Sequence, residues 1–337
     1  MDLSIIIINY KSAQLVLDCI ESIYQQTKQY SFEVILVDND SKDDCKEKVL
    51  AKFPTTRWVQ TGYNAGFARA NNAGIRIAKG EYILILNADT IITDGAIDKS
   101  ISLLKLESDA VGCGVQLLNT DGSNQISGAH FVKGGLNTLL PLPYLGKLIR
   151  YLGHRFKSTI PSVQTIKDKI EVDWIVGAYI MVKKQTLEIS GLMDEDFFMY
   201  AEEIEWCARL RKQGKLYLFA DPKVIHFGGG TSSDYYTTTE NENSKNLWNK
   251  KGRQIIISNM LRIRKQFGIV WFLIITATYI TEIPIFFFGL LISKLFTKNT
   301  TIYSWQNVKD YSKNISVLIK YFSKMLLNKP YFYKVAR

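Results

Sequence analysis

Several features that would identify an activity directly are scarce or absent in this chain of 337 residues. It has 4 cysteines and 3 histidines, all scattered, so neither a disulfide framework nor a zinc site built from neighbouring residues is expected, and a reduced, cytosolic setting is favoured. The G-x-x-x-x-G-K-[ST], G-x-S-x-G and G-x-G-x-x-G patterns are also missing, so P-loop, serine-hydrolase and dinucleotide-binding classes lose their simplest support. A secretory signal is not expected, because Asp2 lies where such a signal has basic residues and the apolar run Leu3–Ile8 is too short.

Charge is unevenly distributed along the chain. The totals of 42 basic and 32 acidic residues give a net charge of +10. Residues 245–337 hold 16 basic and 2 acidic residues, a net charge of +14, whereas residues 1–244 carry −4. An acidic body with a strongly basic tail indicates an anionic partner, either nucleic acid or lipid headgroups.

The first 115 residues alternate between strand and helix patterns. The runs Leu3–Ile8, Glu33–Val37 and Tyr82–Leu86 are rich in apolar residues and predict buried parallel strands. A helix is expected over Ala65–Ala78, closed by a glycine. This order predicts an α/β sandwich around a mostly parallel sheet. Later in the chain, the pattern predicts a strand over Val172–Val182 and a helix over Glu202–Gln213, with residues 120–170 less regular.

The character of the chain changes after Lys265. Ile269–Ile292 is a 24-residue apolar segment, long enough to span a bilayer at about 20 residues per crossing. Glu282 and Pro284 lie near its middle, where a charge is costly and a proline bends a helix. Further on, apolar residues at helical spacing predict an amphipathic helix whose opposite face carries Lys309, Lys313, Lys320 and Lys324.

These patterns predict two regions, a catalytic domain over residues 1–244 and a membrane-association region over residues 245–337. A single crossing would place basic residues on both sides of the membrane, against the positive-inside rule. A peripheral or monotopic arrangement on the cytosolic face of the cell membrane is therefore preferred. The alternative is an ordinary buried helical hairpin.

Two polar triplets follow strands of the predicted sheet. Asp38-Asn39-Asp40 follows the second strand, and Asn87-Ala88-Asp89 follows the Tyr82–Leu86 strand. Ligands of open α/β sheets bind at the carboxyl ends of the strands. Carboxylates there can hold a ribose hydroxyl, or a divalent ion that bridges two phosphates. Each triplet can also be simply a polar turn leaving a strand.

An ordered series of strings makes the chain similar to a known family. Over about residues 3–232 it resembles the inverting family-two glycosyltransferases with the GT-A fold, particularly their rhamnosyltransferase-like branch. The strings are "SIIIINY", "VILVDNDS", "NAGFARANNAGI", "YILILNADT", "VGAYIMVKK", "GLMDEDFFMYAEEIEWCARLRKQG" and "VIHFGGGTS". The resemblance implies a GT-A, Rossmann-like nucleotide-diphospho-sugar transferase sandwich, followed by the C-terminal helical region.

The resemblance assigns the donor site first. It implies that Asn9, Tyr10 and Asp38 hold the nucleobase and ribose, and Asp40 is placed with them. Gly66 and Asn71 fall in the segment near the donor diphosphate, where a glycine turn opening a helix can present free N–H groups to an anion. A plain glycine turn is the alternative for this segment.

The metal and the acid–base groups follow in the same way. Asp89 matches the last carboxylate of the family's D-x-D element, which binds a divalent metal, Mg²⁺ or Mn²⁺, and His226 matches an element near the diphosphate or metal. Asn87 departs from the commoner Asp, which weakens charge-based metal binding. Glu202 and Glu203 match the family's acidic pair, whose second member is the general base on the acceptor hydroxyl.

Asp194 and Glu195 match positions that line the acceptor side of the family's site. Arg209 matches the arginine that follows the acidic pair by about two turns. Trp206 can stack on a sugar or belong to the core, and Arg209 can instead pair with Glu205 at i,i+4. The Gly228–Gly230 run is typical of a loop that closes over the donor.

The sequence thus predicts an inverting glycosyltransferase. Its expected partners are a nucleoside-diphosphate sugar such as dTDP-L-rhamnose, a lipid-linked bacterial surface glycan and an anionic membrane surface, with no nucleic acid. The alternatives are the same fold with a UDP-hexose donor, a nucleotidyltransferase, a nucleic-acid-binding protein that uses the basic tail, and an inactive nucleotide-binding scaffold. The lysines share a helix with an apolar stripe, which disfavours nucleic acid.

Overall fold

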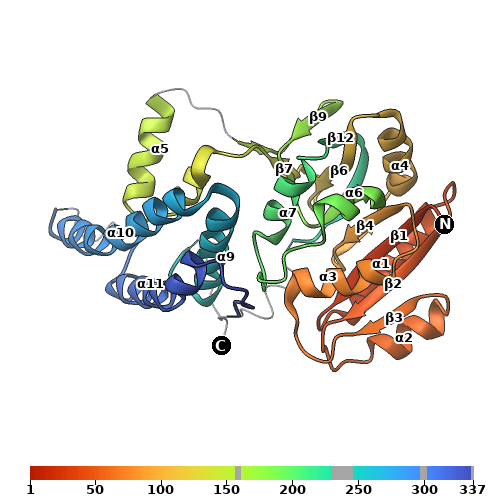
Figure 1. Cartoon of the computed structure of the whole chain (residues 1–337), viewed down its shortest axis with the longest axis horizontal. Helices are drawn as coiled ribbons and strands as arrows, with labels where there is room; N and C mark the ends of the chain where they lie inside the picture. The colour runs from red at the N-terminus through yellow and green to blue at the C-terminus, as the bar shows by residue number, and fades with distance from the viewer. Residues whose placement is uncertain (156–160, 229–245, 297–301, 335–337) are drawn as a thin grey trace. The chain divides into compact units, whose positions relative to one another are not determined.

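The computed structural model describes residues 1–155, 161–228, 246–296 and 302–334 (Figure 1). The chain forms two compact units. The sheet unit comprises Met1–Phe131, Pro161–Phe198 and Glu202–Thr237, and the helical unit comprises Val132–Ile160, Met199–Ala201 and Thr238–Arg337. The helical unit thus includes Val132–Ile160, which the division at residue 244 left in the catalytic domain. The domain boundary itself stays a prediction, because residues 229–245 lie outside the described part.

Twelve strands are defined within the described residues. They are β1 (Leu3–Asn9), β2 (Phe32–Asp38), β3 (Arg57–Gln60), β4 (Tyr82–Leu86), β5 (Thr90–Ile92), β6 (Ala110–Leu118), β7 (Gly128–Ala129), β8 (Ser162–Val163), β9 (Lys169–Val172), β10 (Trp174–Ile175), β11 (Tyr179–Lys183) and β12 (Lys215–His226). The main sheet has nine strands in the order β3-β2-β1-β4-β11-β6-β12-β5, with β9 paired to β12. A three-stranded sheet has the order β10-β7-β8.

The helices divide between the two units. The sheet unit contains α1 (Ala13–Gln26), α2 (Cys45–Lys52), α3 (Gly66–Ile77), α4 (Ala96–Leu106), α6 (Lys184–Ser190) and α7 (Glu202–Leu210). The helical unit contains the 3-10 helix η1 (Lys133–Leu139), α5 (Leu145–Arg155), α9 (Lys250–Phe267), α10 (Ile269–Phe296) and α11 (Trp305–Leu326).

The main sheet is mixed rather than wholly parallel. Strands β1, β2, β3 and β4 pair in parallel, as the sequence predicts, and β6 pairs in parallel with β12. Strand β11 is antiparallel to both of its neighbours, β4 and β6. The prediction of a single strand over Val172–Val182 is wrong, because β10 and β11 are separate strands in this range. Strand β10 pairs with β7 in the small sheet, and a turn closed by a hydrogen bond from Tyr179 N–H to the Val176 carbonyl (3.3 Å) precedes β11.

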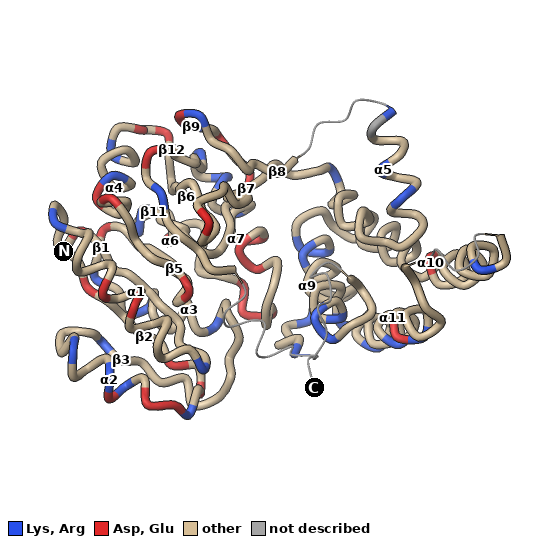
Figure 2. Tube along the Cα trace, turned by 180° about the vertical axis from the view of Figure 1, so that it is seen from behind, with Lys and Arg blue, Asp and Glu red and all other residues tan. Residues whose placement is uncertain are grey.

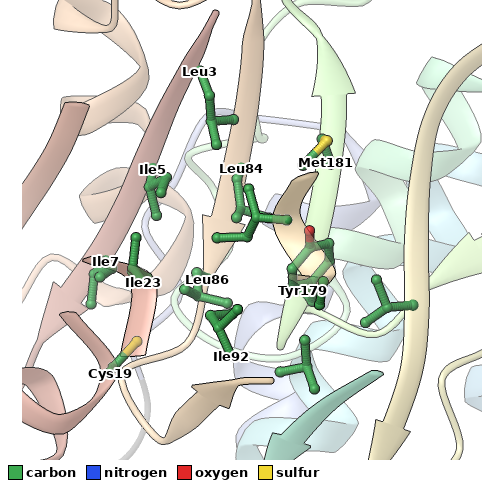
Figure 3. Packing of buried hydrophobic residues seen from close by; sticks show 14 of the residues in the cluster. Leu3, Ile5, Ile7, Cys19, Ile23, Leu84, Leu86, Ile92, Tyr179 and Met181 are labelled. Carbon is green, nitrogen blue, oxygen red and sulfur yellow. The ribbon is translucent and has the colours of Figure 1, made fainter. Parts of the chain in front are cut away.

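The core lies on both faces of the main sheet because alternate residues of a strand point to opposite sides. Leu3, Ile5 and Ile7 of β1 face a cluster that includes residues of α1 and α4 (Figure 3). Ile6 faces the other cluster, to which α3 and α7 contribute. The sheet therefore has helices packed on each face, which is the predicted α/β sandwich.

The helical unit has a core of its own. Helices α9, α10 and α11 each pack against the other two. The buried core comprises Ile256, Met260, Phe272, Ile275, Tyr279, Phe286, Tyr311, Ile315 and Leu318. Among the described residues, α10 is the one helix long and apolar enough to cross a membrane by length and composition. Residues 120–170 are more regular than expected, because η1 and α5 lie there.

Candidate functional site

The site is built at the carboxyl edge of the parallel strands. Asn9 ends β1 and Asp38 ends β2, and the register places the two residues side by side. Both are buried, and Asn9 Nδ2 donates to Asp38 Oδ1 at 2.9 Å. Strand β4 ends beside them and continues into Asn87. The fold thus places both polar triplets at the same edge of the sheet, with β1 between the two strands that they follow.

Asp38 is held by several donors at once. Its Oδ2 accepts from Gln60 Nε2 at 2.8 Å and from Ser41 N–H at 3.2 Å. An ionised carboxylate offers about four acceptor positions. The three side-chain and backbone donors therefore fix the orientation of Asp38 and still leave room for one more hydroxyl.

Asp43 was missed by the sequence analysis. Its carboxylate accepts from Asn9 Nδ2 at 3.1 and 3.2 Å, so Asn9 lies between two carboxylates. The sequence offers no signal for this pairing, because Asp43 lies in a polar loop of unremarkable composition. Asp40 is half-buried with φ of +63°, and its nearest cation is Lys42 at 3.9 Å. Lys42 thus gives Asp40 a local partner on the same turn.

Tyr10 lies directly after β1 and is half-buried. The ammonium of Lys11 lies 5.7 Å from the centre of its ring. Tyr10 thus directly follows Asn9 at the end of β1, and its part in a nucleobase site stays a prediction.

Asp89 and His226 face each other across the edge of the sheet. The antiparallel pairing of β12 with β5 places His226 opposite Thr90, next to Asp89. His226 Nε2 lies 3.4 Å from Asp89 Oδ1, and Asp89 is buried. Asn87 is half-buried, and its backbone N–H donates to the Ala178 carbonyl at 3.0 Å.

Gln125 orients the imidazole and was also missed by the sequence analysis. Its Nε2 donates to the His226 carbonyl at 2.6 Å, so its Oε1 faces His226 Nδ1 at 2.9 Å and accepts the Nδ1 proton. In the neutral tautomer this leaves a lone pair on Nε2, directed towards Asp89. Gln125 is far from His226 in the sequence and belongs to no recognisable motif, so no pattern indicated it.

The donor set fits a divalent cation. A deprotonated imidazole nitrogen and a carboxylate oxygen are both able to coordinate a divalent metal, and here they lie 3.4 Å apart. Among the described residues, no group of three or more His, Cys, Asp or Glu side chains is arranged to hold a metal. Asp89 and His226 would therefore supply two ligands, and diphosphate oxygens the others. A carboxylate with diphosphate oxygens is the usual set for Mg²⁺, whereas the imidazole is more typical of a transition metal.

The start of α3 is tied to both neighbouring segments. Asn39 Oδ1 accepts from Ala65 N–H at 2.7 Å, and the Phe198 carbonyl accepts from Phe67 N–H at 2.8 Å. Gly66 N–H donates to Asn64 Oδ1 at 3.2 Å. The N–H groups of Ala65, Gly66 and Phe67 are therefore bonded to protein acceptors in this conformation, whereas the glycine turn was expected to present free N–H groups.

Gly66 is required by packing instead. Its φ is +79°, and a Cβ atom at this position would lie 2.1 Å from the Phe198 carbonyl oxygen. Asn71 is buried one turn further along α3, with Nδ2 donating to the Phe67 carbonyl at 3.1 Å. Among the described residues, Asn71 Oδ1 has no hydrogen-bond partner.

Glu202 and Glu203 begin α7, where the helix dipole favours carboxylates. Glu202 is buried and Glu203 is half-buried. The Gly177 turn lies between Phe67 of α3 and Glu203, since a Cβ built on Gly177 would be 3.6 and 3.8 Å from their side chains. The adjoining Ala178 bonds to Asn87, so this one turn joins the Asp89 segment to the acidic pair.

The acceptor-side residues have mainly structural partners. Trp206 is fully buried, and its indole N–H donates to the Gly191 carbonyl at 3.1 Å. Its assignment to sugar stacking is corrected, because stacking requires an exposed ring face. Arg209 forms two-pronged hydrogen bonds with Glu205, at 2.8 Å from both Nε and Nη2, as the i,i+4 alternative predicts.

Asp194 and Glu195 lie in the turn before the Phe197–Tyr200 segment. Asp194 Oδ1 accepts from Asp196 N–H at 2.9 Å. Burial raises the pKa of Glu195, but hydrogen bonds from Arg76 and Asn72 outweigh it and lower that pKa overall. This turn is therefore anchored to α3. Gly228 has φ of +69°, and the rest of the predicted glycine loop lies outside the described residues.

Comparison with known proteins finds a family model that matches the first part of the chain. Residues 4–157 match the family description "Glycosyl transferase family 2". The low-salt glycan biosynthesis hexosyltransferase of Haloferax volcanii is 29% identical over 217 residues, which cover 63% of this chain and 62% of that protein. The dTDP-rhamnosyl transferase RfbF of Shigella flexneri is 26% identical, with 63% and 66% covered. The chain thus spans less than two thirds of the length of both relatives.

Among solved structures, the crystal structure of GalNAc-T7 with UDP, GalNAc and Mn²⁺ is similar with a TM-score of 0.51. The match covers 79% of this chain and 51% of that chain, at 14% sequence identity. At this identity the likeness establishes the fold alone, and the fold is the predicted GT-A type.

Proposed function

Since the chain carries a glycosyl transferase family 2 domain, we propose that it transfers a sugar from a nucleoside-diphosphate donor to a hydroxyl of a lipid-linked glycan. The observation that carries this proposal is the Asp89–His226 pair, 3.4 Å apart, at the sheet edge where Asn9 and Asp38 also end their strands. Such an edge combines a site for a nucleoside with one for a charged diphosphate.

Each group has a proposed part in donor binding. Asp38, oriented by Asn9, Gln60 and Ser41, accepts a hydrogen bond from a ribose hydroxyl, and Tyr10 packs against the base. Asp89 and His226 hold a divalent metal, which offsets the negative charge that develops on the departing diphosphate. Gln125 keeps the His226 Nε2 lone pair directed towards that position.

Glu203 is the proposed general base. It takes the proton from the acceptor hydroxyl as that oxygen forms a bond to C1 of the sugar. The bond from C1 to the diphosphate breaks on the opposite face, so the configuration at C1 is inverted. Glu202 is more deeply buried at the same helix start and positions its neighbour.

Two donors are proposed in order of preference. The name of the Shigella relative supports dTDP-L-rhamnose, and that of the Haloferax relative supports the alternative of another hexose, such as a UDP-hexose. The acceptor is proposed to lie on the cytosolic face of the membrane, with the helical unit held there peripherally or monotopically. The support for this location is the apolar helix α10 and the net charge of +14 over residues 245–337.

A donor panel tests this function. The full chain is incubated with dTDP-L-rhamnose, UDP-hexoses and GDP-sugars, with Mn²⁺, Mg²⁺ or EDTA, and release of the nucleoside diphosphate is measured. Release from one donor class, lost in EDTA, is the expected result. No release from any sugar nucleotide would overturn the proposal.

A further inference from the structure

The helix α10 presents a wide apolar surface to the exterior of the helical unit. Its exposed side chains include Val270, Leu273, Phe288, Ile292, Leu295 and Phe296, the last of them 80% exposed. At about 100° per residue these fall on one side of the helix, opposite the buried Phe272, Tyr279 and Phe286. The exposed face runs over the 28 residues of α10, about 42 Å at 1.5 Å per residue.

Two hydroxyl groups on α10 are hydrogen-bonded within the helix and do not depend on water. Thr278 and Thr281 donate their hydroxyl hydrogens to the carbonyls of Ile274 and Ala277, at 2.9 and 2.8 Å, one turn earlier in the same helix. Glu282 and Lys294 are the charged residues of α10, and Glu282 is buried. An exposed face with internally satisfied hydroxyls and no carboxylate is suited to an apolar environment.

Glu282 has a structural partner that explains a charge inside the apolar segment. Its Oε1 accepts from the backbone N–H of Tyr144 at 2.7 Å, and its Oε2 accepts from that of Leu145 at 3.1 Å. Leu145 is the first residue of α5, so Glu282 caps the start of that helix. The carboxylate that argued against a membrane segment therefore faces protein, on the side of α10 away from the exposed face.

Helix α11 decides between crossing the bilayer and lying in its plane. It runs antiparallel alongside α10, since Trp305 is 5.2 Å from Phe287 and Phe322 is 5.3 Å from Phe272, measured between ring centres. Tyr311 Oη donates to the Tyr279 carbonyl at 2.8 Å between these two contacts. Most of α10 is thus covered on one side by α11.

The outer face of α11 carries four exposed lysines, Lys309, Lys313, Lys320 and Lys324. Basic residues recur along α11, whereas α10 is uncharged for most of its length (Figure 2). If α10 crossed a bilayer, these four lysines would be carried into a hydrocarbon core about 30 Å thick. The pairing of the two helices therefore excludes a crossing by α10 in this fold.

One end of the exposed face carries residues typical of the headgroup region. Lys294 lies 5.6 Å from the ring centre of Trp305, which itself contacts Phe287. An amphipathic aromatic ring beside a lysine is the arrangement found where apolar and aqueous regions of a membrane meet.

We propose that the exposed face of α10 docks into one leaflet of an anionic phospholipid bilayer and lies in the membrane plane without crossing it. Trp305 and Lys294 lie at headgroup level, and the positive charge of residues 245–337 attracts the anionic lipids. This inference rests on the membrane association in the proposed function and adds the surface, the depth and the topology.

Vesicle flotation of the full chain tests the surface. The probe is vesicles of phosphatidylcholine with or without about one third phosphatidylglycerol. Wild type is expected to float with the anionic vesicles, and Phe288→Asp combined with Ile292→Asp is expected to weaken partitioning by more than about tenfold. The control is Leu106→Asp, an exposed apolar residue (79%) at the end of α4 in the sheet unit, which should leave flotation unchanged.

A second variant guards against misfolding. Leu295→Asp with Phe296→Asp changes the exposed end of α10, and thermal unfolding checks that both variants keep the wild-type transition. If both folded variants still floated with the vesicles, the proposal that the exposed face of α10 binds the membrane would be overturned. A second outcome would also overturn the proposal. If the wild-type chain bound no vesicles but formed a dimer that the variants lost, the exposed face of α10 would be assigned to contact with a second copy of the chain.

Cysteine labelling tests the topology. Gln266→Cys and Lys294→Cys lie on the two flanks of the apolar segment, and the four native cysteines are buried. In sealed vesicles both introduced thiols are expected to react with an impermeant maleimide from outside, whereas protection of one flank would show a crossing and overturn the inference. Release of nucleoside diphosphate from soluble donor, measured on the same samples, separates failure of the proposed chemistry from failure of membrane docking.

Discussion

The two units each bury carboxylates, but they surround them with different groups. In the sheet unit, Asp89 lies 3.4 Å from Nε2 of the His226 imidazole, whose Nδ1 is hydrogen-bonded to Gln125. In the helical unit, both oxygens of Glu282 accept backbone N–H groups of the start of α5. Comparison of the two shows that burial alone does not identify a reactive carboxylate. An imidazole nitrogen beside a buried carboxylate is a pair of groups that can bind a cation, whereas backbone N–H donors on both carboxylate oxygens indicate a structural cap.

The largest effect is expected from Glu203→Gln, which tests whether the sheet unit uses its carboxylates chemically. Loss of the base should lower the turnover number by about 10²–10⁴-fold, because the acceptor hydroxyl then keeps its proton. Nucleotide affinity, measured by calorimetry, should be unchanged. Glu188→Gln, at an exposed position on α6, is the matched control. Turnover within about twofold of wild type would assign the base to another group.

Gln125→Leu tests whether Gln125 orients His226 for metal binding together with Asp89. Without its acceptor at Nδ1, the imidazole can adopt the other tautomer and turn away from Asp89. We expect Mn²⁺ affinity in the presence of a nucleoside diphosphate to fall by about 10–100-fold. Titration calorimetry measures this directly. Gln116→Leu would disturb a different buried network, so Gln164→Leu, nearer the surface, is the better control.

Glu282→Leu tests the structural role of the buried carboxylate in the helical unit. This change leaves the N–H groups of Tyr144 and Leu145 without their acceptor and should lower the free energy of unfolding by about 1–3 kcal/mol. Glu282→Gln keeps one acceptor oxygen and should cost less. Chemical denaturation measures both, and release of nucleoside diphosphate should remain near wild type. If Glu282→Leu removed turnover without changing stability, the cap would be the wrong explanation for this carboxylate.

The smallest effect is expected from Trp206→Phe. The phenyl ring keeps most of the buried volume but loses the hydrogen bond to the Gly191 carbonyl, for a cost of about 1 kcal/mol. The Michaelis constant for the acceptor should not change, since the indole is fully buried. A tenfold rise in that constant at unchanged thermal stability would restore the sugar-stacking hypothesis.

The sequence predicted what depends on local patterns. Apolar runs and helical spacing located β1, β2, β4, α3 and α11, because burial of a strand or of one helix face leaves a periodic signal. The position of Asp38 and Asp89 directly after strands also predicted that both lie at the carboxyl edge of the sheet, since the parallel topology places these strand ends on one edge. The predicted α/β sandwich with a C-terminal helical region is confirmed.

Contacts between distant segments could not be predicted in this way. The Gln125–His226 pair, the Glu282 cap and the bond from Phe67 N–H to the Phe198 carbonyl each join residues far apart in sequence. β11 interrupts the parallel order because its partners, β4 and β6, are set by the whole sheet rather than by its own residues. For Trp206 the sequence left sugar stacking and the core as alternatives, and packing of α7 against the sheet places it in the core.

The measurement that tests the central claim most directly is the configuration of the transferred sugar. The account assigns one displacement at C1, with Glu203 as base on the face opposite the diphosphate. Proton NMR of the product should therefore show the anomeric configuration opposite to that of the donor. Retention of the donor configuration would contradict a single displacement at this sheet edge.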